Sequence, residues 1–281
     1  MSIVNGIEKD SEANLLKFEL GLPPPWGAWC RTLLGLDEVE KVYSKTKKLI
    51  LEKKSNAAPG FILSDASLFS KYALESLGVA FIDPNEQLKK LRELKGPLIF
   101  VSNHPFGAID GLIFIYFMSQ VRSDFRFIAN SELKIFPELR SILCSVEILH
   151  SKTRQSTNRH TNFLQLRALM SYLKGGGLVG IFPAGKVAIS SEDPWNDHLG
   201  LLVKWTQATV VPIFIDGRNS LLVRWVGGLI PSLQLPLLVR EMLQHRRQIH
   251  YQVREVLTPK EMSTYADAQE LTAFIRSKTL P

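Results

Sequence analysis

The sequence has few cysteines and no long apolar run. Cys30 and Cys144 are the two cysteines among 281 residues, and neither belongs to a CxxC or Cys/His spacing. We therefore expect no disulfide framework or zinc site, and a reducing cytoplasmic compartment fits. The sequence lacks a basic amino-terminal region followed by an apolar run, so we expect no secretory signal. No stretch approaches the roughly 20 apolar residues of a spanning helix, so any membrane contact should be peripheral.

The composition is that of a folded protein with a basic surface. Hydrophobic residues make up 45% of the chain, enough for a sizeable core, and the length fits one large domain or one domain with a small appendage. The 34 Lys and Arg residues outnumber the 27 Asp and Glu residues, which gives a net charge of +7. This surplus favours polyanionic surfaces, either nucleic acid or anionic lipid. No nucleic-acid-binding motif is present, so nucleic acid is not an expected partner.

The sequence divides into two regions near residue 60. Residues 1–60 are predicted to form an N-terminal helical region, interrupted by PPPWG at 23–27. Within it, apolar residues at helical spacing predict an amphipathic helix from Leu36 to Lys54. Residues 61–281 form the main predicted domain.

From residue 97 onward, short apolar runs alternate with longer helical patterns, as in βα units. Strands are predicted at Leu98–Ser102, Phe125–Ala129, Leu178–Phe182, Val210–Ile215 and Ile249–Val256. Helices are predicted from Ser64 or Asp65 to Gly78, and at Gly111–Val121, Asn158–Leu173 and Tyr265–Thr279. The predicted fold class is α/β, with a central, mostly parallel sheet flanked by helices.

A histidine and an aspartate follow the strand LIFVS in the segment NHPFGAIDG, residues 103–111. His104 is thus predicted at the carboxyl end of a strand, where α/β sheets usually bind ligands. A turn through Pro105 and Gly107 would bring Asp110 back to His104. The carboxylate would then fix the imidazole tautomer and leave the other nitrogen as a general base. The alternative is a loop histidine, with Asp110 only capping the next helix.

The second candidate is a glycine-rich segment, LKGGGLVGIFPAGKVAIS, at residues 173–190. Gly185 can adopt positive φ and let backbone N–H groups approach a ligand, and Lys186 would add a charge for a phosphate. The spacing is not that of a Walker loop. The alternative is a tight turn with a solvated lysine.

The third candidate is VVPIFIDGRNS, residues 210–220, in which a strand ends at a charged turn. Arg218 is either an anion ligand at the same sheet edge or a surface residue. Further basic or polar candidates, most of which we expect to be solvated, are Arg122, Arg126, Asn130, Arg154 and Arg159.

Two segments are candidate membrane contacts. The stretch from Leu221 to Gln248 is rich in Leu, Val and Trp, is interrupted by glycine and proline, and ends in a basic cluster. It is either a buried connection followed by a surface helix or an interfacial segment, with apolar residues in lipid and arginines among phosphates. The second segment is in the N-terminal region, with Trp26, Trp29, Leu33 and Leu34.

Taken in order, NHPFGAIDG, DFRFIAN at 124–130, GIFPAGKVAIS and VVPIFIDGRNS resemble the glycerolipid acyltransferase superfamily, which contains the 1-acylglycerol-3-phosphate acyltransferases. The resemblance covers roughly residues 60–260 and is greatest to the bacterial branch labelled putative hemolysin or lysophospholipid acyltransferase-like. It implies a glycerol-3-phosphate acyltransferase-like fold, with residues 61–281 as the acyltransferase domain.

Two motifs depart from the superfamily pattern. Five residues separate His104 from Asp110 instead of four, which resembles the HPFGxxDG form of the hemolysin-like branch. The usual FPEG block reads FPAG, and Lys186 follows it where the branch commonly has glutamate. A different acceptor head group is one meaning of this lysine.

The resemblance implies an O-acyltransferase that moves a fatty acyl group from a thioester of acyl-carrier protein or coenzyme A to a lysolipid hydroxyl. His104, oriented by Asp110, would be the general base, and backbone N–H groups near Gly185 would stabilise the oxyanion. No metal or other cofactor is expected, since the thioester is a co-substrate. The residues implied to bind substrates are Asn103, Arg154, Phe182, Pro183, Gly185, Lys186 and Arg218.

The implied acceptor is a lysophosphatidic-acid-like molecule or an N-acylated amino-acid lipid, in phospholipid or aminolipid biosynthesis. We expect a peripheral position on the inner face of the cytoplasmic membrane, against an anionic surface, with acyl-carrier protein as one candidate partner. The alternative function is a lipid- or membrane-binding, hemolysin-like protein without catalysis. The intact His104 and Asp110 pair argues against that alternative.

Overall fold

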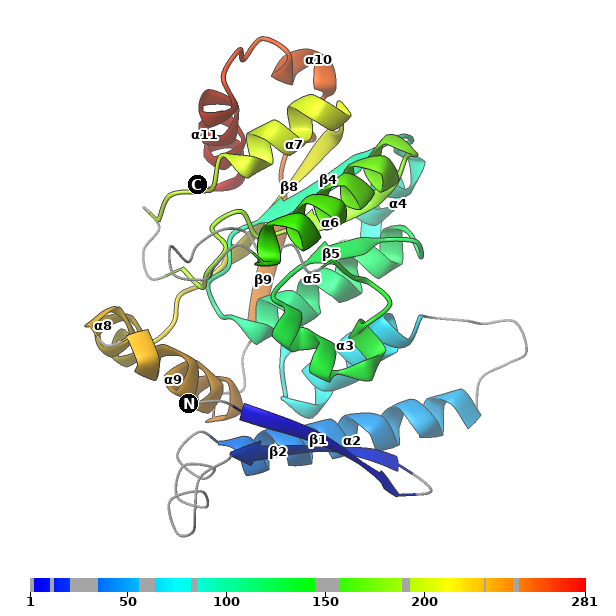
Figure 1. The fold of residues 1–281 in the computed structure, drawn as a ribbon, viewed down its shortest axis with the longest axis vertical. Helices are drawn as coiled ribbons and strands as arrows, with labels where there is room; N and C mark the ends of the chain where they lie inside the picture. The colour runs from blue at the N-terminus through cyan, green and yellow to red at the C-terminus, as the bar shows by residue number, and fades with distance from the viewer. Residues whose placement is uncertain are drawn as a thin grey trace. The chain divides into compact units, whose positions relative to one another are not determined.

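The computed structural model describes residues 3–10, 13–20, 35–55, 64–81, 85–144, 157–188, 193–229, 231–244 and 248–281 (Figure 1). The chain forms two compact units that do not follow sequence order. Unit 1 contains Met1–Phe81, Phe106–Tyr116 and Gly217–Ile249, and unit 2 contains Ile82–Pro105, Phe117–Asp216 and His250–Pro281. Two elements, α5 (Ala108–Val121) and β9 (Gln248–Val253), contribute residues to both units.

Unit 2 is an α/β unit. Its strands are β4 (Leu98–Ser102), β5 (Arg126–Ile128), β6 (Leu143–Cys144), β7 (Leu178–Ile181) and β8 (Thr209–Asp216), with part of β9. Its helices are α4 (Asn85–Glu93), α6 (Thr157–Lys174), α7 (His198–Thr206), α10 (Pro259–Met262) and α11 (Ala268–Thr279), with the short 3-10 turns η1 (Ser131–Ile135) and η2 (Pro137–Leu139).

The strands of unit 2 form one sheet in the order β9-β8-β4-β7-β5-β6. Neighbouring strands run parallel, except that β9 is antiparallel to β8. The central strands β4 and β7 are continuous apolar runs and are buried along their length, as expected when helices cover both faces. These features confirm the predicted α/β class with a mostly parallel central sheet.

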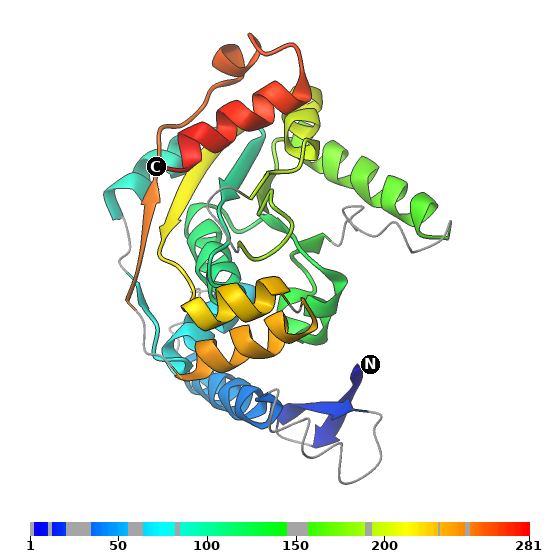
Figure 2. The same ribbon diagram turned by 90° about the vertical axis from the view of Figure 1, so that its left-hand side faces the viewer.

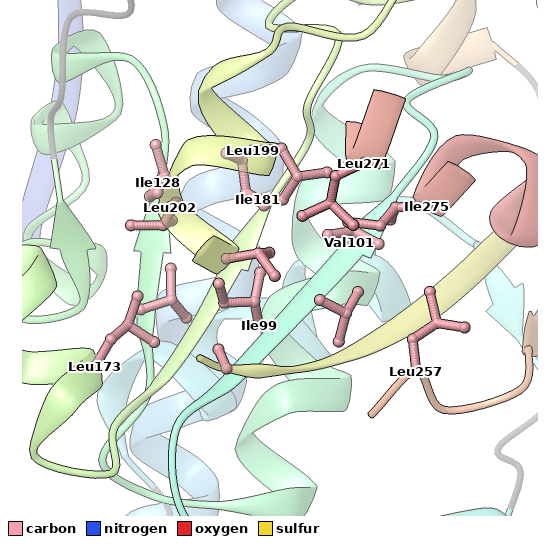
Figure 3. Close-up of a cluster of buried hydrophobic side chains, with 14 of the residues drawn as sticks. Ile99, Val101, Ile128, Leu173, Ile181, Leu199, Leu202, Leu257, Leu271 and Ile275 are labelled. Atoms are coloured by element: carbon pink, nitrogen blue, oxygen red, sulfur yellow. The ribbon is translucent and has the colours of Figure 1, made fainter. Parts of the chain in front are cut away.

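One face of this sheet is covered by α7, α11 and the carboxyl end of α6, while the rest of α6 extends away from the sheet (Figures 2 and 3). Gly200 lets α7 approach α11, because a side chain there would clash with the backbone of Ala268. The Gly200 N–H also donates to Thr272 Oγ1 at 3.0 Å. The buried residues that meet in this core include Ile99, Val101, Leu173, Ile181, Leu199, Leu202, Leu271 and Ile275.

The opposite side of the core contains aromatic residues. Phe117, near the end of α5, lies 5.9 Å from Phe100 of β4 and 5.3 Å from Tyr251 of β9 between ring centroids. Successive side chains of β4 point to opposite faces of the sheet, so Ile99 and Val101 pack in one core layer and Phe100 packs in the other. The carboxyl end of β4 is therefore fixed from both sides.

Unit 1 begins with a β-hairpin, which corrects the predicted helical character of the first residues. The strands β1 (Ile3–Asp10) and β2 (Ala13–Leu20) pair antiparallel, with Ile3 opposite Leu20 and Asp10 opposite Ala13. The signal for this hairpin was the alternation of apolar and charged residues in LKFEL at 16–20, which has the period of a strand. A separation of two residues also suits a hairpin connection.

The other elements of unit 1 are α2 (Leu36–Ser55), α3 (Asp65–Ser76), β3 (Ala80–Phe81), α8 (Leu221–Leu229), α9 (Pro231–Gln244) and the first part of α5. β3 pairs in parallel with the first two residues of β9. The predicted helix from Leu36 is confirmed, and Tyr43 on its buried face packs against Phe69 of α3. Of the two residues predicted to begin this helix, Ser64 is the N-cap of α3, since its Oγ accepts from the Ser67 N–H at 3.2 Å, and Asp65 is the first helical residue.

Several expectations fall on residues outside those described. They include the break at 23–27, Cys30 and the proposed membrane contact at Trp26, Trp29, Leu33 and Leu34. Cys144 carries a free thiol whose pKa is raised by burial. The domain boundary near residue 60 stays a prediction. Within the described ranges, no helix combines the length and apolar character that crossing a membrane requires.

Candidate functional site

The side chain of Asn103, the residue before His104, continues the hydrogen bonding between β4 and β8. The backbone pairing of β4 with β8 ends at Ser102 opposite Ile213. Beyond it, Asn103 Nδ2 donates to the Ile215 carbonyl and Asn103 Oδ1 accepts from the Ile215 N–H, both at 2.8 Å. The amide thus replaces one further peptide pair and fixes the point at which the chain leaves the sheet. The predicted contact of Asn103 with substrate stays a prediction.

His104 is held by its ring face and by its backbone. Its imidazole stacks on the Phe182 ring with centroids 4.1 Å apart and planes 9° apart, and its carbonyl accepts from the Ala188 N–H at 2.8 Å. Phe182 directly follows β7, the parallel neighbour of β4, so both residues lie at the carboxyl edge of the sheet. Phe127 of β5 in turn meets Phe182 edge-on, with centroids 5.7 Å apart. A line of aromatic rings from three strands fixes the plane of the imidazole.

The FPAG block forms a tight turn. The Gly185 N–H donates to the Phe182 carbonyl at 3.0 Å, and Gly185 has φ +67°, a left-handed conformation that favours glycine. The Pro183 carbonyl accepts from the Asn196 N–H at 3.0 Å, which joins the turn to the segment before α7. Because the Gly185 N–H is used within the turn, a backbone donor for an oxyanion would have to come from a neighbouring residue.

Lys186 follows the turn and is about half exposed. Its Nζ lies 3.4 Å from Asp193 Oδ1, whose side chain is only 17% exposed. An ion pair of this length and exposure contributes little to stability. The lysine can therefore reorient toward an anionic ligand at small cost.

Asp110 lies in the first turn of α5, in unit 1. The helix begins at Ala108, earlier than the predicted Gly111, and the Asp110 side chain is completely buried. Its Oδ2 accepts from the N–H groups of Phe106 at 2.6 Å and Gly107 at 3.1 Å. In a capping box, the side chain of the third helical residue accepts from the backbone N–H of the N-cap residue. Asp110 makes this bond to Gly107, which is at the N-cap position and has φ +78°. The alternative of Asp110 as the N-cap is thus corrected, because Asp110 is the third residue of α5 and its carboxylate binds N–H groups at the start of the helix. Its pairing with His104 stays a prediction.

The turn that follows β8 lies against the same loop of unit 1. Gly217 has φ +130°, and a side chain at this position would clash with the ring of the buried Phe106. Arg218 comes next in the chain and is exposed. The close approach of the loop before α5 to the turn before Arg218 explains why a glycine stands at position 217.

The structure thus separates the predicted site residues into two groups. Unit 2 brings together Asn103, His104, Phe182, Pro183, Gly185 and Lys186 at its sheet edge. Unit 1 holds Asp110, and Phe106 links its loop to the turn that carries Arg218. Arg154 lies outside the described residues, as does the side chain of Arg159. Asn130 is exposed after β5, and Arg122 and Arg126 contact the opposite sheet edge.

Two aromatic residues of this arrangement were missed from the sequence. Phe127 and Phe106 both lie within recognised blocks, yet neither was singled out. Their signal was weak, because apolar residues in a strand or turn are usually core residues. Among the described residues, no three His, Cys, Asp or Glu side chains gather as metal ligands. The expected metal-free reaction stays a prediction.

Residues 65–280 match the model of a family described as Acyltransferase. The chain belongs to this acyltransferase family. Its fold is similar to the crystal structure of the 1-acyl-sn-glycerophosphate (LPA) acyltransferase PlsC from Thermotoga maritima, with a TM-score of 0.51. The identity is 15%, and the match covers 90% of this chain and 93% of the PlsC chain. No curated protein sequence matches the chain significantly.

Membership of the family confirms the predicted glycerolipid acyltransferase superfamily and the predicted enzyme class. The family match spans both the loop with Asp110 and the edge with His104. The hemolysin-like branch within the superfamily stays a prediction, as do the acyl donor and the roles of individual residues.

Proposed function

We propose that this acyltransferase transfers a fatty acyl group from a thioester of acyl-carrier protein or coenzyme A to a hydroxyl of a lysolipid. The observation that carries the proposal is the stacking of His104 on Phe182, which joins the HPFG and FPAG blocks at one sheet edge. Family membership and the fold likeness to PlsC, a 1-acyl-sn-glycerophosphate acyltransferase, support a lysophosphatidic-acid-like acceptor. An N-acylated amino-acid lipid is the second acceptor class.

In the proposed reaction, His104 removes the proton of the acceptor hydroxyl as that oxygen attacks the thioester carbonyl carbon. The new C–O bond forms and the carbonyl electrons move onto oxygen. Collapse of this intermediate breaks the C–S bond, and the leaving thiolate takes the proton from the imidazolium. Protons balance, and no metal or other cofactor takes part. General-base catalysis of this kind typically contributes roughly 10² to 10⁴ in rate.

We assign Asp110 the role of orienting His104. A carboxylate bound to one imidazole nitrogen fixes the tautomer and stabilises the imidazolium. Two backbone N–H groups already fix the Asp110 carboxylate in a buried position, so it would need no rearrangement during the reaction. For acceptor phosphate or carboxylate we propose Arg154, Lys186 and Arg218, and for the oxyanion a backbone N–H beside Gly185.

The proposed acceptor resides in a bilayer, so we also propose peripheral attachment to the inner face of the cytoplasmic membrane. The net charge of +7 suits an anionic surface.

The test is a thioester-release assay with acyl-carrier protein and coenzyme A donors. The acceptors are lysophosphatidic acid, other lysophospholipids and N-acyl amino acids, with the acylated product identified by mass spectrometry. We expect acceptor-dependent release with at least one donor and one acceptor class. Hydrolysis of the thioester without any acylated lipid would contradict the proposal.

The orienting role is tested with Asp110→Asn, which keeps an oxygen to accept the two N–H bonds but removes the charge. We expect at least a tenfold loss of kcat, because the imidazole loses its charged partner. Asp197→Asn, at an exposed residue before α7, is the matched control and should keep the wild-type rate. An Asp110→Asn protein as active as this control would exclude the role.

A further inference from the structure

Helix α8 exposes a cluster of large apolar side chains. Leu221, Leu222 and Trp225 are 69%, 59% and 71% exposed, whereas Val223 is 4% exposed. With 3.6 residues per turn, the three exposed residues lie within about 100° around the helix axis, and Val223 lies on the opposite side. The helix therefore has a buried face and an apolar outer face.

This cluster differs from other exposed apolar residues in the described ranges. The other large ones are Leu51, Leu164 and Trp205, and each stands alone on a separate helix, α2, α6 and α7. Single exposed apolar residues are normal on protein surfaces, whereas a contiguous group with a tryptophan marks an interaction site. The three residues of α8 form such a group.

The amino-terminal end of α8 is anchored, so the exposure does not come from a frayed helix. The Glu241 carboxylate of α9 accepts from the Ser220 N–H at 3.0 Å and from Ser220 Oγ at 2.7 Å. Ser220 Oγ also accepts from the Val223 N–H at 3.4 Å. α8 and α9 lie side by side (Figures 1 and 2). The pair thus presents Leu221, Leu222 and Trp225 from a fixed base.

The charge around this cluster is positive. The described charged residues between 217 and 244 are Arg218, Arg224 and Arg240 and one acid, a net charge of +2, and the exposed Asp216 directly precedes them. The acid within this range is Glu241, which is buried and bound to Ser220. Arg218 and Arg240 are exposed, and Arg224 lies within α8 beside Trp225. Exposed apolar residues with more cations than acids beside them in the chain complement an anionic lipid surface.

We propose that the α8 surface, formed by Leu221, Leu222 and Trp225 with the neighbouring arginines, is a membrane-docking surface for anionic bilayers. The apolar side chains enter the boundary between head groups and acyl chains, and the arginines meet lipid phosphates. It deepens the proposed function, because it names the surface through which the enzyme reaches a bilayer-held acceptor. Docking itself needs no acyl transfer, so the two proposals fail separately.

The test is flotation of the full chain with vesicles of phosphatidylcholine alone or mixed with phosphatidylglycerol. The variant Leu221→Ser/Leu222→Ser/Trp225→Ser should lose at least about tenfold in binding to the mixed vesicles. Trp205→Ser, which removes an exposed tryptophan from α7, is the matched control and should bind as wild type does. Because the substituted residues are exposed, melting temperatures should stay close to that of wild type.

The single variant Trp225→Phe gives a second measurement that does not depend on the triple variant. Lipids brominated near the head group should quench tryptophan fluorescence of wild type more than that of Trp225→Phe, because Trp225 reaches the bilayer. Equal quenching of the two proteins would overturn the proposal. Binding of the triple variant at the wild-type level would also overturn it, as would equal binding of wild type to neutral and anionic vesicles.

Two further outcomes separate other occupants of this surface. Suppose that wild type is a dimer, that the triple variant is a monomer and that neither binds vesicles. The surface then joins two copies of the chain, and the proposal is wrong.

With a water-soluble, short-chain acceptor, the triple variant should keep the wild-type rate, and with a bilayer-held acceptor it should be slower. Equal rates on both acceptors would contradict docking through α8, whatever the identity of the acceptor.

Discussion

The two edges of the sheet in unit 2 hold their polar side chains differently. At the amino edge, Arg122 donates to both carboxylate oxygens of Asp124, at 2.9 and 2.7 Å, and to the Gly176 carbonyl at 2.7 Å. Tyr172 Oη donates to the Asp124 carbonyl and accepts from the Leu178 N–H. These polar groups tie the segments before β5 and β7 together.

At the carboxyl edge, the side chain that is held in place is the imidazole ring of His104, whose face contacts the ring of Phe182. Asn103 secures the backbone there, and His104 is held by stacking on Phe182. Stacking fixes the imidazole plane without using the ring nitrogens. We propose that the amino edge serves stability and that the carboxyl edge serves chemistry. Substitutions at the two edges should therefore affect different measurements.

The largest effect in this comparison is expected for Phe182→Leu. Losing the stacked ring lets the imidazole leave its position, and misplacement of a catalytic group by about 1 Å costs roughly a hundredfold in rate. We expect kcat to fall by roughly ten- to a hundredfold, with little change in KM. Phe274→Leu, which removes a phenylalanine stacked on Tyr265 far along the chain, is the control and should keep kcat. Equal kcat values in the two variants would show that stacking does not position His104.

A smaller effect, on stability alone, is expected for Tyr172→Phe at the amino edge. The variant leaves the Leu178 N–H and the Asp124 carbonyl without the hydroxyl, which typically costs about 1 to 2 kcal/mol in unfolding free energy. The rate per folded molecule should not change. Urea unfolding and initial rates on the same samples measure both quantities, and a fall in kcat would break the division between the edges.

The pH dependence of stability offers a still smaller effect at the amino edge. The hydrogen bond from Arg122 lowers the pKa of Asp124 below its usual value. A lowered pKa means that the stabilisation is present above the unfolded-state pKa, about 3.9, and is lost as pH falls through the lower folded value. Because the Asp124 side chain is 55% exposed, the contribution should stay below about 1 kcal/mol.

This dependence is measured as the difference in unfolding free energy between wild type and Asp124→Asn across pH. We expect the wild type to be the more stable protein at neutral pH and the difference to disappear in acid. A difference that grows toward low pH would contradict the assigned sign.

The smallest stability effect is expected for Lys186→Ala at the carboxyl edge, within about 0.5 kcal/mol, because its ion pair with Asp193 is exposed. If Lys186 binds acceptor phosphate, KM for a phosphate-bearing acceptor should rise several-fold and KM for a neutral acceptor should not. Lys174→Ala, at the exposed end of α6 before β7, is the matched control from the other edge. A uniform KM for both acceptor types would remove Lys186 from the phosphate site.

The sequence predicted the centre of the sheet better than its margins. β4 has the predicted bounds and β7 ends one residue before the prediction, because buried parallel strands are continuous apolar runs with clear ends. The two-residue strands β3 and β6 and the hairpin at 3–20 were not predicted. Short edge strands carry too few residues to show a period, and their pairing depends on partners distant in sequence.

The residues of the candidate site could be predicted from the sequence, but the contacts between them could not. The order of the blocks indicated His104, Asp110 and the FPAG turn. His104 and the FPAG turn lie at the same edge of the sheet because they follow the parallel strands β4 and β7. That α5 begins at Ala108 could not be read from the sequence, because Asp110 caps the helix backward and Gly107 takes positive φ. Stacking of His104 on Phe182 depends on the register of β4 and β7, which no local pattern encodes.

The most direct test of His104 as the general base is the rate of acyl transfer by His104→Ala at equal concentrations of folded protein. His250→Ala, which changes an exposed histidine on β9, is the matched control. We expect His104→Ala to be slower by roughly 10² to 10⁴ with an unchanged melting temperature, and His250→Ala to match wild type. A folded His104→Ala protein that transfers acyl groups at the wild-type rate would contradict the assignment of His104 as the base.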